Sequence, residues 1–375
     1  MTPFAITAPP RILFGRGAAA KAPALIRAFG ARGIVVHGAD RARADWLLAA
    51  LGPGTLALAC PREPVLAVLT QALAAARDHR PDWVVAIGGG AALDLGKALA
   101  ALIPSPGDPM DHLEIIGKGL PLTQVPLPFI ALPTTAGTGA EVTRNAVIGL
   151  PDHGRKVSLR DDRMVARLAI VDPALTDGCP RAVTLASGLD AVTQVIEPYV
   201  SLRATPYTDA LARPAIAPGL LALQQLMQAE DSLARDRMAW VSLCGGLALA
   251  NSGLGAVHGL AGVIGGMTGA AHGAICGALL GPVLTENRRA ATGTARARLD
   301  EVCTMIAAAL GCDADTAPQA LQHWARQAGL PGLVDLGVAP DQHVPIAEAA
   351  RQASAMQANP VSLDGAALGR VLAAA

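Results

Sequence analysis

Residues 83–100 read W-V-V-A-I-G-G-G-A-A-L-D-L-G-K-A-L-A. The apolar run at 83–87 predicts a buried strand, the three glycines predict a turn, and a helix is expected over 91–102. Consecutive glycines permit unusual backbone angles and keep side chains out of the way. Amide groups at the start of the helix would then face an anion, and a pyrophosphate fits there. The glycines alone also allow a tight turn without a ligand, and their spacing is not the G-x-G-x-x-G pattern of the common dinucleotide fold.

Outward from this stretch, short apolar runs rich in β-branched residues alternate with helical segments up to about Pro173. This alternation predicts an α/β domain with a mostly parallel sheet covered on both faces. Beyond Pro173 the β-branched runs disappear and helical periodicity continues, so we expect an α/β domain over 1–175 and an all-α domain over 176–375. The expected strands are 11–14, 33–37, 56–59, 83–87, 129–132 and 168–171, and the expected helices of the first domain are 18–29, 42–51, 65–79 and 91–102.

Composition excludes several classes of protein. The 375 residues carry 30 basic and 30 acidic side chains, so a nucleic-acid partner is not expected. No apolar run is long enough to span a membrane, and the N-terminus lacks the pattern of a signal peptide. The six cysteines form no C-x-x-C pair, which favours reduced thiols in the cytoplasm, with a role as metal ligand or nucleophile as the less favoured alternative.

A second stretch rich in glycine and threonine follows another expected strand. Residues 129–148 read F-I-A-L-P-T-T-A-G-T-G-A-E-V-T-R-N-A-V-I. Thr134, Thr135 and Thr138 offer hydroxyl groups, and the glycines between them leave backbone donors accessible. Ligands of doubly wound sheets bind at the carboxyl ends of strands, so two such strand ends could meet one phosphate-bearing ligand. The alternative is a turn with N-capping threonines.

The strand expected at 33–37 bears on cofactor choice. It is followed by Asp40, which could hydrogen-bond an adenosine ribose and reject a 2′-phosphate, whereas Arg41 or Arg43 would accept that phosphate. Both kinds of residue are present, so the sequence leaves NAD and NADP open. A helix N-cap at Asp40 with exposed arginines explains the same pattern.

Four polar side chains interrupt the apolar helical sequence between 184 and 273. Asp190 and Gln194 are four residues apart and share a helix face, while His258 and His272 each precede a glycine. Buried polar groups are costly unless something satisfies them, and a divalent metal would do so and could polarise a substrate oxygen. A lone buried histidine is more often a satisfied core residue than a ligand, so these residues alone are a weak signal.

The motifs G-G-G-x-x-x-D-x-x-K, P-T-T-A-G-T-G-x-E-V-T, G-L-D-A and two H-G pairs together resemble the iron-containing (group III) alcohol dehydrogenases, whose relatives include maleylacetate reductases and glycerol dehydrogenases. The resemblance runs from Arg11 to His272 and more loosely to the C-terminus. It implies a dehydroquinate synthase-like α/β domain, a helical domain, and a cleft between them that holds NAD or NADP and a divalent metal, Fe or Zn. It also suggests a homodimer.

The resemblance assigns roles by position. The pyrophosphate would lie on the glycine turn, the nicotinamide ribose near the motif aspartate, and the rest of the cofactor beside the threonines and one lysine, while the metal would be held by the four polar residues. These positions are Gly88, Gly89, Gly90, Asp94, Thr134, Thr135, Thr138 and Lys156 for the cofactor, and Asp190, Gln194, His258 and His272 for the metal.

Two positions depart from the family pattern. Gln194 stands where the family usually has histidine, and an amide oxygen is a weaker donor than imidazole. Gly262 stands where the family often has a histidine thought to pass protons. We therefore expect weakened metal binding in an enzyme that transfers hydride between nicotinamide and a small alcohol or aldehyde, with Asp190, His258 and His272 at the catalytic centre. The alternatives are a metal-independent enzyme resembling maleylacetate reductase and acting on a keto acid, and a nucleotide-binding protein without catalysis.

Overall fold

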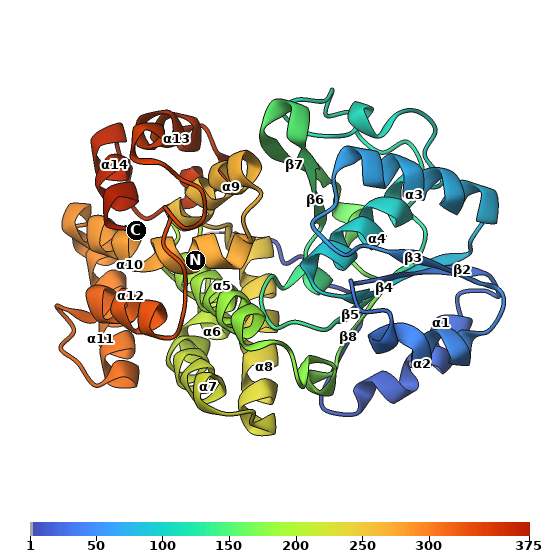
Figure 1. Cartoon of the computed structure of the whole chain (residues 1–375), viewed down its shortest axis with the longest axis horizontal. Helices are drawn as coiled ribbons and strands as arrows, with labels where there is room; N and C mark the ends of the chain where they lie inside the picture. Colours follow the sequence, from blue (N-terminus) through green and yellow to red (C-terminus); the bar gives the residue numbers. More distant parts are fainter. Residues whose placement is uncertain (1–2) are drawn as a thin grey trace. The chain divides into compact units, whose positions relative to one another are not determined.

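The computed structural model describes residues 3–375, which divide into two compact units (Figure 1). We call residues 7–135 with 139–177 the sheet unit, and residues 3–6, 136–138 and 178–375 the helical unit. Each unit has its own apolar core.

The sheet unit is built on six parallel strands in the order β1-β8-β5-β4-β2-β3. This confirms the predicted parallel sheet, and each expected strand lies within about one residue of an observed one. The strands are β1 (Ile12–Phe14), β2 (Gly33–His37), β3 (Thr55–Ala59), β4 (Trp83–Gly88), β5 (Phe129–Pro133) and β8 (Leu168–Val171).

Helices cover both faces of this sheet (Figure 1). Successive side chains of a strand point to opposite faces, so Val84 and Ala86 of β4 join one apolar cluster while Val85 and Ile87 join the other. The first cluster contains α3 and α4 residues and the second contains α1 and α2 residues. Burial on both faces explains why the strands read as nearly continuous apolar runs. The helices are α1 (Ala22–Arg27), α2 (Ala42–Leu51), α3 (Leu66–His79) and α4 (Gly90–Leu102).

An antiparallel hairpin of β6 (Asn145–Leu150) and β7 (Arg155–Arg160) was not among the expected strands. Its burial alternates along β6, where Ala146 and Ile148 are buried and lie in the same apolar cluster as α4. The hairpin therefore adds to the cover of one sheet face.

The helical unit is organised around α5, which packs against α6, α7, α8 and α10. Every residue from Gly188 to the end of α5 is buried, including its polar side chains. Its helices are α5 (Arg181–Val200), α6 (Pro206–Ala212), α7 (Ile216–Gln228), α8 (Ser232–Ser252), α9 (Ala256–Thr268), α10 (His272–Ala290), α11 (Gly293–Leu310), α12 (Ala317–Gln327), α13 (His343–Arg351) and α14 (Gly365–Ala374).

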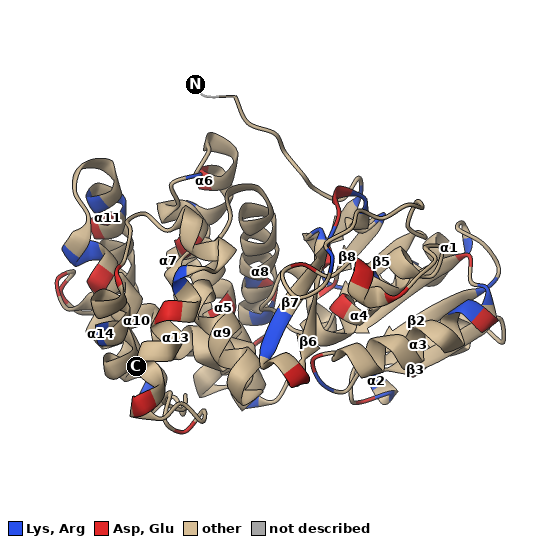
Figure 2. Cartoon of the chain, turned by 90° about the horizontal axis from the view of Figure 1, so that it is seen from above, with Lys and Arg blue, Asp and Glu red and all other residues tan. Residues whose placement is uncertain are grey.

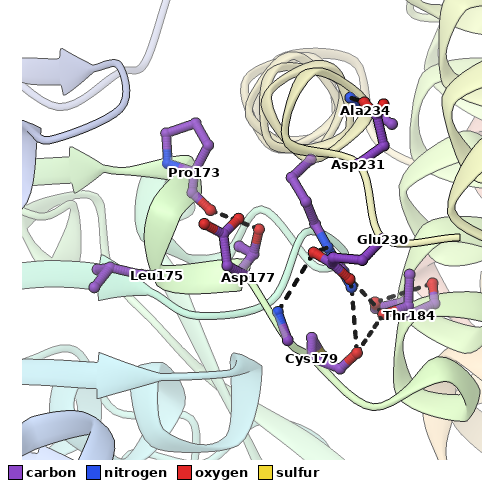
Figure 3. Close-up of polar contacts among 12 residues, drawn as sticks. Pro173, Leu175, Asp177, Cys179, Thr184, Glu230, Asp231 and Ala234 are labelled. Atoms are coloured by element: carbon purple, nitrogen blue, oxygen red, sulfur yellow. Dashed lines mark hydrogen bonds and ion pairs between the residues drawn. The ribbon is translucent and has the colours of Figure 1, made fainter.

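Arg235 of α8 fixes the start of α5 through contacts with three residues that are labelled in Figure 3, Cys179, Thr184 and Glu230. Its guanidinium donates to the Thr184 hydroxyl at 2.9 Å, to the Cys179 carbonyl at 3.2 Å and to both carboxylate oxygens of Glu230 at 2.8 and 2.7 Å. Since Arg235 is 5% exposed, these bonds satisfy a buried charge. They hold the helix that carries the polar residues described below.

Charged residues of opposite sign neighbour one another in both units (Figure 2). Arg288, for example, lies 2.6 Å from Asp300 and from Asp315. Among residues 3–375, no single helix combines the length and hydropathy of a membrane span. The pair α8 and α9 meets both criteria only jointly, with a bend of 98° between them.

Candidate metal centre and dinucleotide-binding turn

Four potential metal ligands converge inside the helical unit. One ligand atom each of Asp190, His258, His272 and Cys276 lies within 4.8 Å of the others. The Nε2 atoms of His258 and His272 lie 3.4 and 3.8 Å from Oδ1 of Asp190, and Cys276 Sγ lies 3.6 Å from His272 Nε2. The structure thus brings together three of the four predicted metal ligands and adds a cysteine.

Helix geometry explains this convergence. His272 is the first residue of α10 and Cys276 lies one turn later on the same face. Gly273, which follows His272, lies so close to Ala186 of α5 that a Cβ atom on this glycine would overlap the Ala186 carbonyl. Only glycine permits this approach, and the approach brings His272 beside Asp190.

A carboxylate that the sequence analysis missed orients His258. Oε2 of Glu197 lies 2.6 Å from His258 Nδ1, and its Oε1 accepts the backbone amide of Val257 at 2.7 Å. A proton on Nδ1 leaves the Nε2 lone pair free on the side of Asp190. The signal was in the sequence, because Asp190, Gln194 and Glu197 are spaced i, i+4, i+7 and share one face of α5.

Three buried side-chain atoms on α5 and α9 have no hydrogen-bond partner among the described residues. They are Asp190 Oδ1, Gln194 Oε1 and His258 Nε2. Leaving a buried polar group unsatisfied costs about 1–3 kcal/mol, and more for a charged one. All three atoms are lone-pair donors when the histidine is neutral. Asp190 Oδ1 and His258 Nε2 lie 3.4 Å apart, so a divalent cation beside them would satisfy both, and Gln194 follows Asp190 by one turn of α5. The residues present therefore fit a metal.

The charges of the cluster reinforce this interpretation. Burial by itself raises the pKa of the Asp190 carboxyl, but the charges of His272 and His258 outweigh it and hold the pKa below its usual value. Burial likewise lowers the pKa of His272, but Cys276 and Asp190 raise it to about 9. Metal binding requires an unprotonated imidazole, so a cation that binds would displace any proton on the His272 ring.

The glycine turn lies in the sheet unit, where two neighbouring strands end. β4 ends at Gly88 and no side chain caps the N-terminus of α4. The Thr134 amide donates to the Gly88 carbonyl at 2.9 Å, and a Cβ on Gly89 would lie 3.3 Å from the Thr135 hydroxyl. A Cβ on Gly88 would lie 2.6 Å from the Cβ of Ala92. The structure thus brings the three predicted glycines together with two of the three predicted threonines.

The third threonine is grouped differently. Thr138 belongs to the segment 136–138, which is counted with the helical unit. In that segment a Cβ on Gly137 would lie 2.8 Å from the Ser187 Cβ of α5.

The remaining predicted cofactor residues lie in the sheet unit. Asp94 lies one turn into α4, where its charge helps to raise the pKa of the Cys60 thiol to about 12, although burial is the larger cause. Lys156 lies on β7 and forms an ion pair with Glu63. Asp40 accepts the Ala42 amide at 3.0 Å, but the N-cap residue of α2 is Arg41 and not Asp40, which was one of the sequence alternatives.

Known proteins share both units. A sequence profile for the iron-containing alcohol dehydrogenases matches residues 9–173, and a profile for the C-terminal part of that family matches residues 184–375. The chain is 33% identical over 301 residues to the probable alcohol dehydrogenase EutG of Salmonella typhimurium. This match covers 80% of this chain and 74% of the relative. It is 41% identical over 231 residues to long-chain-alcohol dehydrogenase 1 of Geobacillus thermodenitrificans, where the match covers 61% of this chain and 58% of the relative.

Among solved structures, the fold matches a sulfoacetaldehyde reductase from Bifidobacterium kashiwanohense in complex with NAD⁺. The TM-score is 0.86 at 27% sequence identity, and the match covers 100% of this chain and 98% of that one. The names of these two relatives refer to different substrates, a long-chain alcohol and sulfoacetaldehyde. The similarity therefore does not indicate which substrate this chain uses.

Proposed function

Because the chain belongs to the iron-containing alcohol dehydrogenase family, we propose that it transfers hydride reversibly between a nicotinamide dinucleotide and a small alcohol or aldehyde, assisted by a divalent metal. The observation that carries the proposal is the group of buried atoms without partners, Asp190 Oδ1, Gln194 Oε1 and His258 Nε2. A core built only for stability would pair these atoms or replace them with apolar groups.

The metal would be held by Asp190, His258 and His272, with Gln194 as a weaker neutral donor. A bound divalent cation supplies Lewis-acid polarisation of the substrate oxygen. Asp190 contributes a negative charge, and Glu197 keeps the donor nitrogen of His258 toward the cluster. The side chain of His272 is 30% exposed, compared with 1% for Asp190, so His272 marks the side from which solvent or substrate can reach the cluster.

The cofactor would bind with its pyrophosphate on Gly88, Gly89 and Gly90, where backbone amides and the uncapped start of α4 face the anion. Bound NAD or NADP supplies the hydride donor or acceptor at its nicotinamide. We assign Thr134, Thr135, Thr138, Asp94 and Lys156 to the rest of the cofactor, and Asp40 to its adenosine ribose. The complex of the sulfoacetaldehyde reductase with NAD⁺ supports a nicotinamide dinucleotide.

Proton transfer would use water instead of a second histidine. A Cβ on Gly262 would meet nothing within 4 Å, so there is open space beside this residue. Water in that space would carry the proton between substrate oxygen and solvent.

We also propose a cytoplasmic homodimer. All six cysteines are free, and five of them are buried, as expected in a reducing compartment. The family resemblance supports the dimer, and light scattering on the purified protein would test it through the measured mass.

The test of the function is turnover by the purified chain. The protein is first stripped with a chelator and then supplied with Fe²⁺ or Zn²⁺, NADH or NADPH, and a panel of aldehydes, while the absorbance of reduced nicotinamide is followed. We expect oxidation of the cofactor only with metal, and at least a tenfold loss in Asp190→Asn. Turnover of a keto acid by the stripped protein would instead support the metal-independent alternative. Cofactor binding without turnover under any condition would support a nucleotide-binding protein.

A further inference from the structure

We propose that the sulfur of Cys276 is a metal ligand, so that the metal is held by Asp190, His258, His272 and Cys276 and is zinc rather than iron. This inference rests on the proposed function. Its starting point is the position of Cys276 Sγ, which lies 3.6 Å from His272 Nε2 and within 4.8 Å of the ligand atoms of Asp190 and His258.

The local structure aims the sulfur at this point. Cys276 and His272 are one turn apart on α10, so their side chains extend from the same helix face toward α5. Cys276 is fully buried, and its sulfur lies 3.6 Å from His272 Nε2. That contact does not satisfy Asp190 Oδ1 or His258 Nε2, which remain without partners beside it.

The other cysteines show that this placement is specific. Five of the six are buried, but among residues 3–375 Cys276 alone belongs to a cluster of three or more histidine, cysteine or acidic ligands. Cys303 is also fully buried, on α11, and lies outside that cluster. Burial therefore does not by itself bring a cysteine to the metal residues.

The chemistry of the donors then points to zinc. Gln194 offers a neutral amide oxygen, which leaves Asp190 as the only anionic donor if the sulfur is not counted. A Cys276 thiolate adds a second negative charge and a soft donor, and its proton passes to solvent as the metal binds. Two imidazoles, one carboxylate and one thiolate form a four-ligand set typical of Zn²⁺, which can add a fifth ligand during reaction. Cys276 thus compensates for the weak donor at position 194.

The experiment is X-ray absorption on the full chain loaded with Zn²⁺. We expect a sulfur shell at about 2.3 Å in addition to nitrogen and oxygen at about 2.0–2.1 Å. Cys276→Ser should lose the sulfur shell and bind Zn²⁺ at least about 100-fold more weakly, because even changes outside the ligand shell cost about 10–100-fold. Cys303→Ser, which alters an equally buried thiol, should keep both the shell and the affinity.

A second measurement does not depend on a variant. Co²⁺ bound to the wild-type protein should show sulfur-to-cobalt charge-transfer absorption in the near ultraviolet. A third measurement compares the wild-type protein with Cys276→Ser. When Fe²⁺ and Zn²⁺ compete for the site under anaerobic conditions, the preference for Zn²⁺ should be lower in the variant. Bound Zn²⁺ with only nitrogen and oxygen neighbours and no charge-transfer band would overturn the role of Cys276 while leaving the proposed function intact. A wild-type chain that binds no metal at all would refute both.

Discussion

The Glu197 carboxylate contacts two adjacent residues of α9, because one oxygen lies 2.6 Å from His258 Nδ1 and the other accepts the Val257 amide at 2.7 Å. Glu197 is 4% exposed and comes from the same helix face as Asp190. It therefore fixes both the start of α9 and the direction in which the His258 ring presents its second nitrogen.

The first prediction concerns this contact. Glu197→Gln keeps an oxygen that can accept from Nδ1 but removes the charge, so we expect metal affinity to fall about 10–100-fold. Competition with a chromophoric chelator measures it. Glu286→Gln removes another buried carboxylate, one that pairs with Arg370 of α14 outside the cluster, and should leave the affinity unchanged. Equal losses in both variants would show that the effect is only structural.

The second prediction concerns position 194. Gln194→His replaces an unpaired buried amide oxygen with an imidazole, which is the better donor for zinc and iron. We expect affinity for the metal to rise by about tenfold or more, equivalent to about 1.4 kcal/mol. Gln194→Ala should change affinity little, since the amide contributes weakly. Weaker binding in Gln194→His would mean that this side chain does not reach the metal.

The third prediction is linkage between metal and stability. A ligand that binds only the folded state at 100 times its dissociation constant stabilises that state by about 2.7 kcal/mol. We expect Zn²⁺ to raise the melting temperature of the wild-type chain, and a chelator to reverse the change. Asp190→Asn should melt at the same temperature with and without Zn²⁺. A wild-type melting curve that does not respond to the metal would count against the site.

The sequence predicted the sheet unit well, because a strand buried on both faces must be an apolar run, and β2 and β4 are such runs. The hairpin β6–β7 was missed because only alternate residues of β6 are buried, so its apolar signal is half as dense. At the candidate site, the sequence analysis named Asp190 and His258 from their residue types. Glu197 and Cys276 were missed because only their spacing along a helix, i+7 from Asp190 and i+4 from His272, reveals them.

The fourth prediction concerns Glu141, a buried carboxylate of the sheet unit. Burial raises its pKa to about 7, although its own backbone amide and Lys97 oppose the shift. The folded state therefore binds more protons than the unfolded state between the unfolded pKa of 4.5 and about 7, and stability falls as pH rises through that range.

The Glu141→Gln variant lacks this dependence. As the pH rises through that range, its free energy of unfolding should therefore increase by about 1–3 kcal/mol relative to that of the wild type. Lys97 has a pKa lowered to about 8, mainly by burial, so measurements below that pH isolate Glu141. Urea unfolding followed by tryptophan fluorescence is the measurement. A background with Trp240→Phe and Trp324→Phe limits the signal to the two tryptophans of the sheet unit. Parallel pH profiles for the two proteins would contradict the assignment.

The fifth prediction tests the glycine turn. In Gly88→Ala the new methyl group would lie 2.6 Å from the Ala92 Cβ and 3.2 Å from the Gly38 backbone nitrogen, neither of which is a flexible side-chain end. The turn must shift, which we expect to cost about 1–3 kcal/mol. The same shift moves the amides at the start of α4, so binding of NADH should weaken together with stability.

Gly38→Ala is the matched control, because a methyl group there meets nothing within 4 Å and the backbone angle is not in the left-handed region. The same fluorescence background reports unfolding of the sheet unit, and quenching or energy transfer to NADH reports binding. We expect Gly38→Ala to unfold like the wild type while Gly88→Ala unfolds at lower urea. If Gly88→Ala is destabilised but binds NADH with wild-type affinity, the glycine turn serves packing alone and the pyrophosphate lies elsewhere.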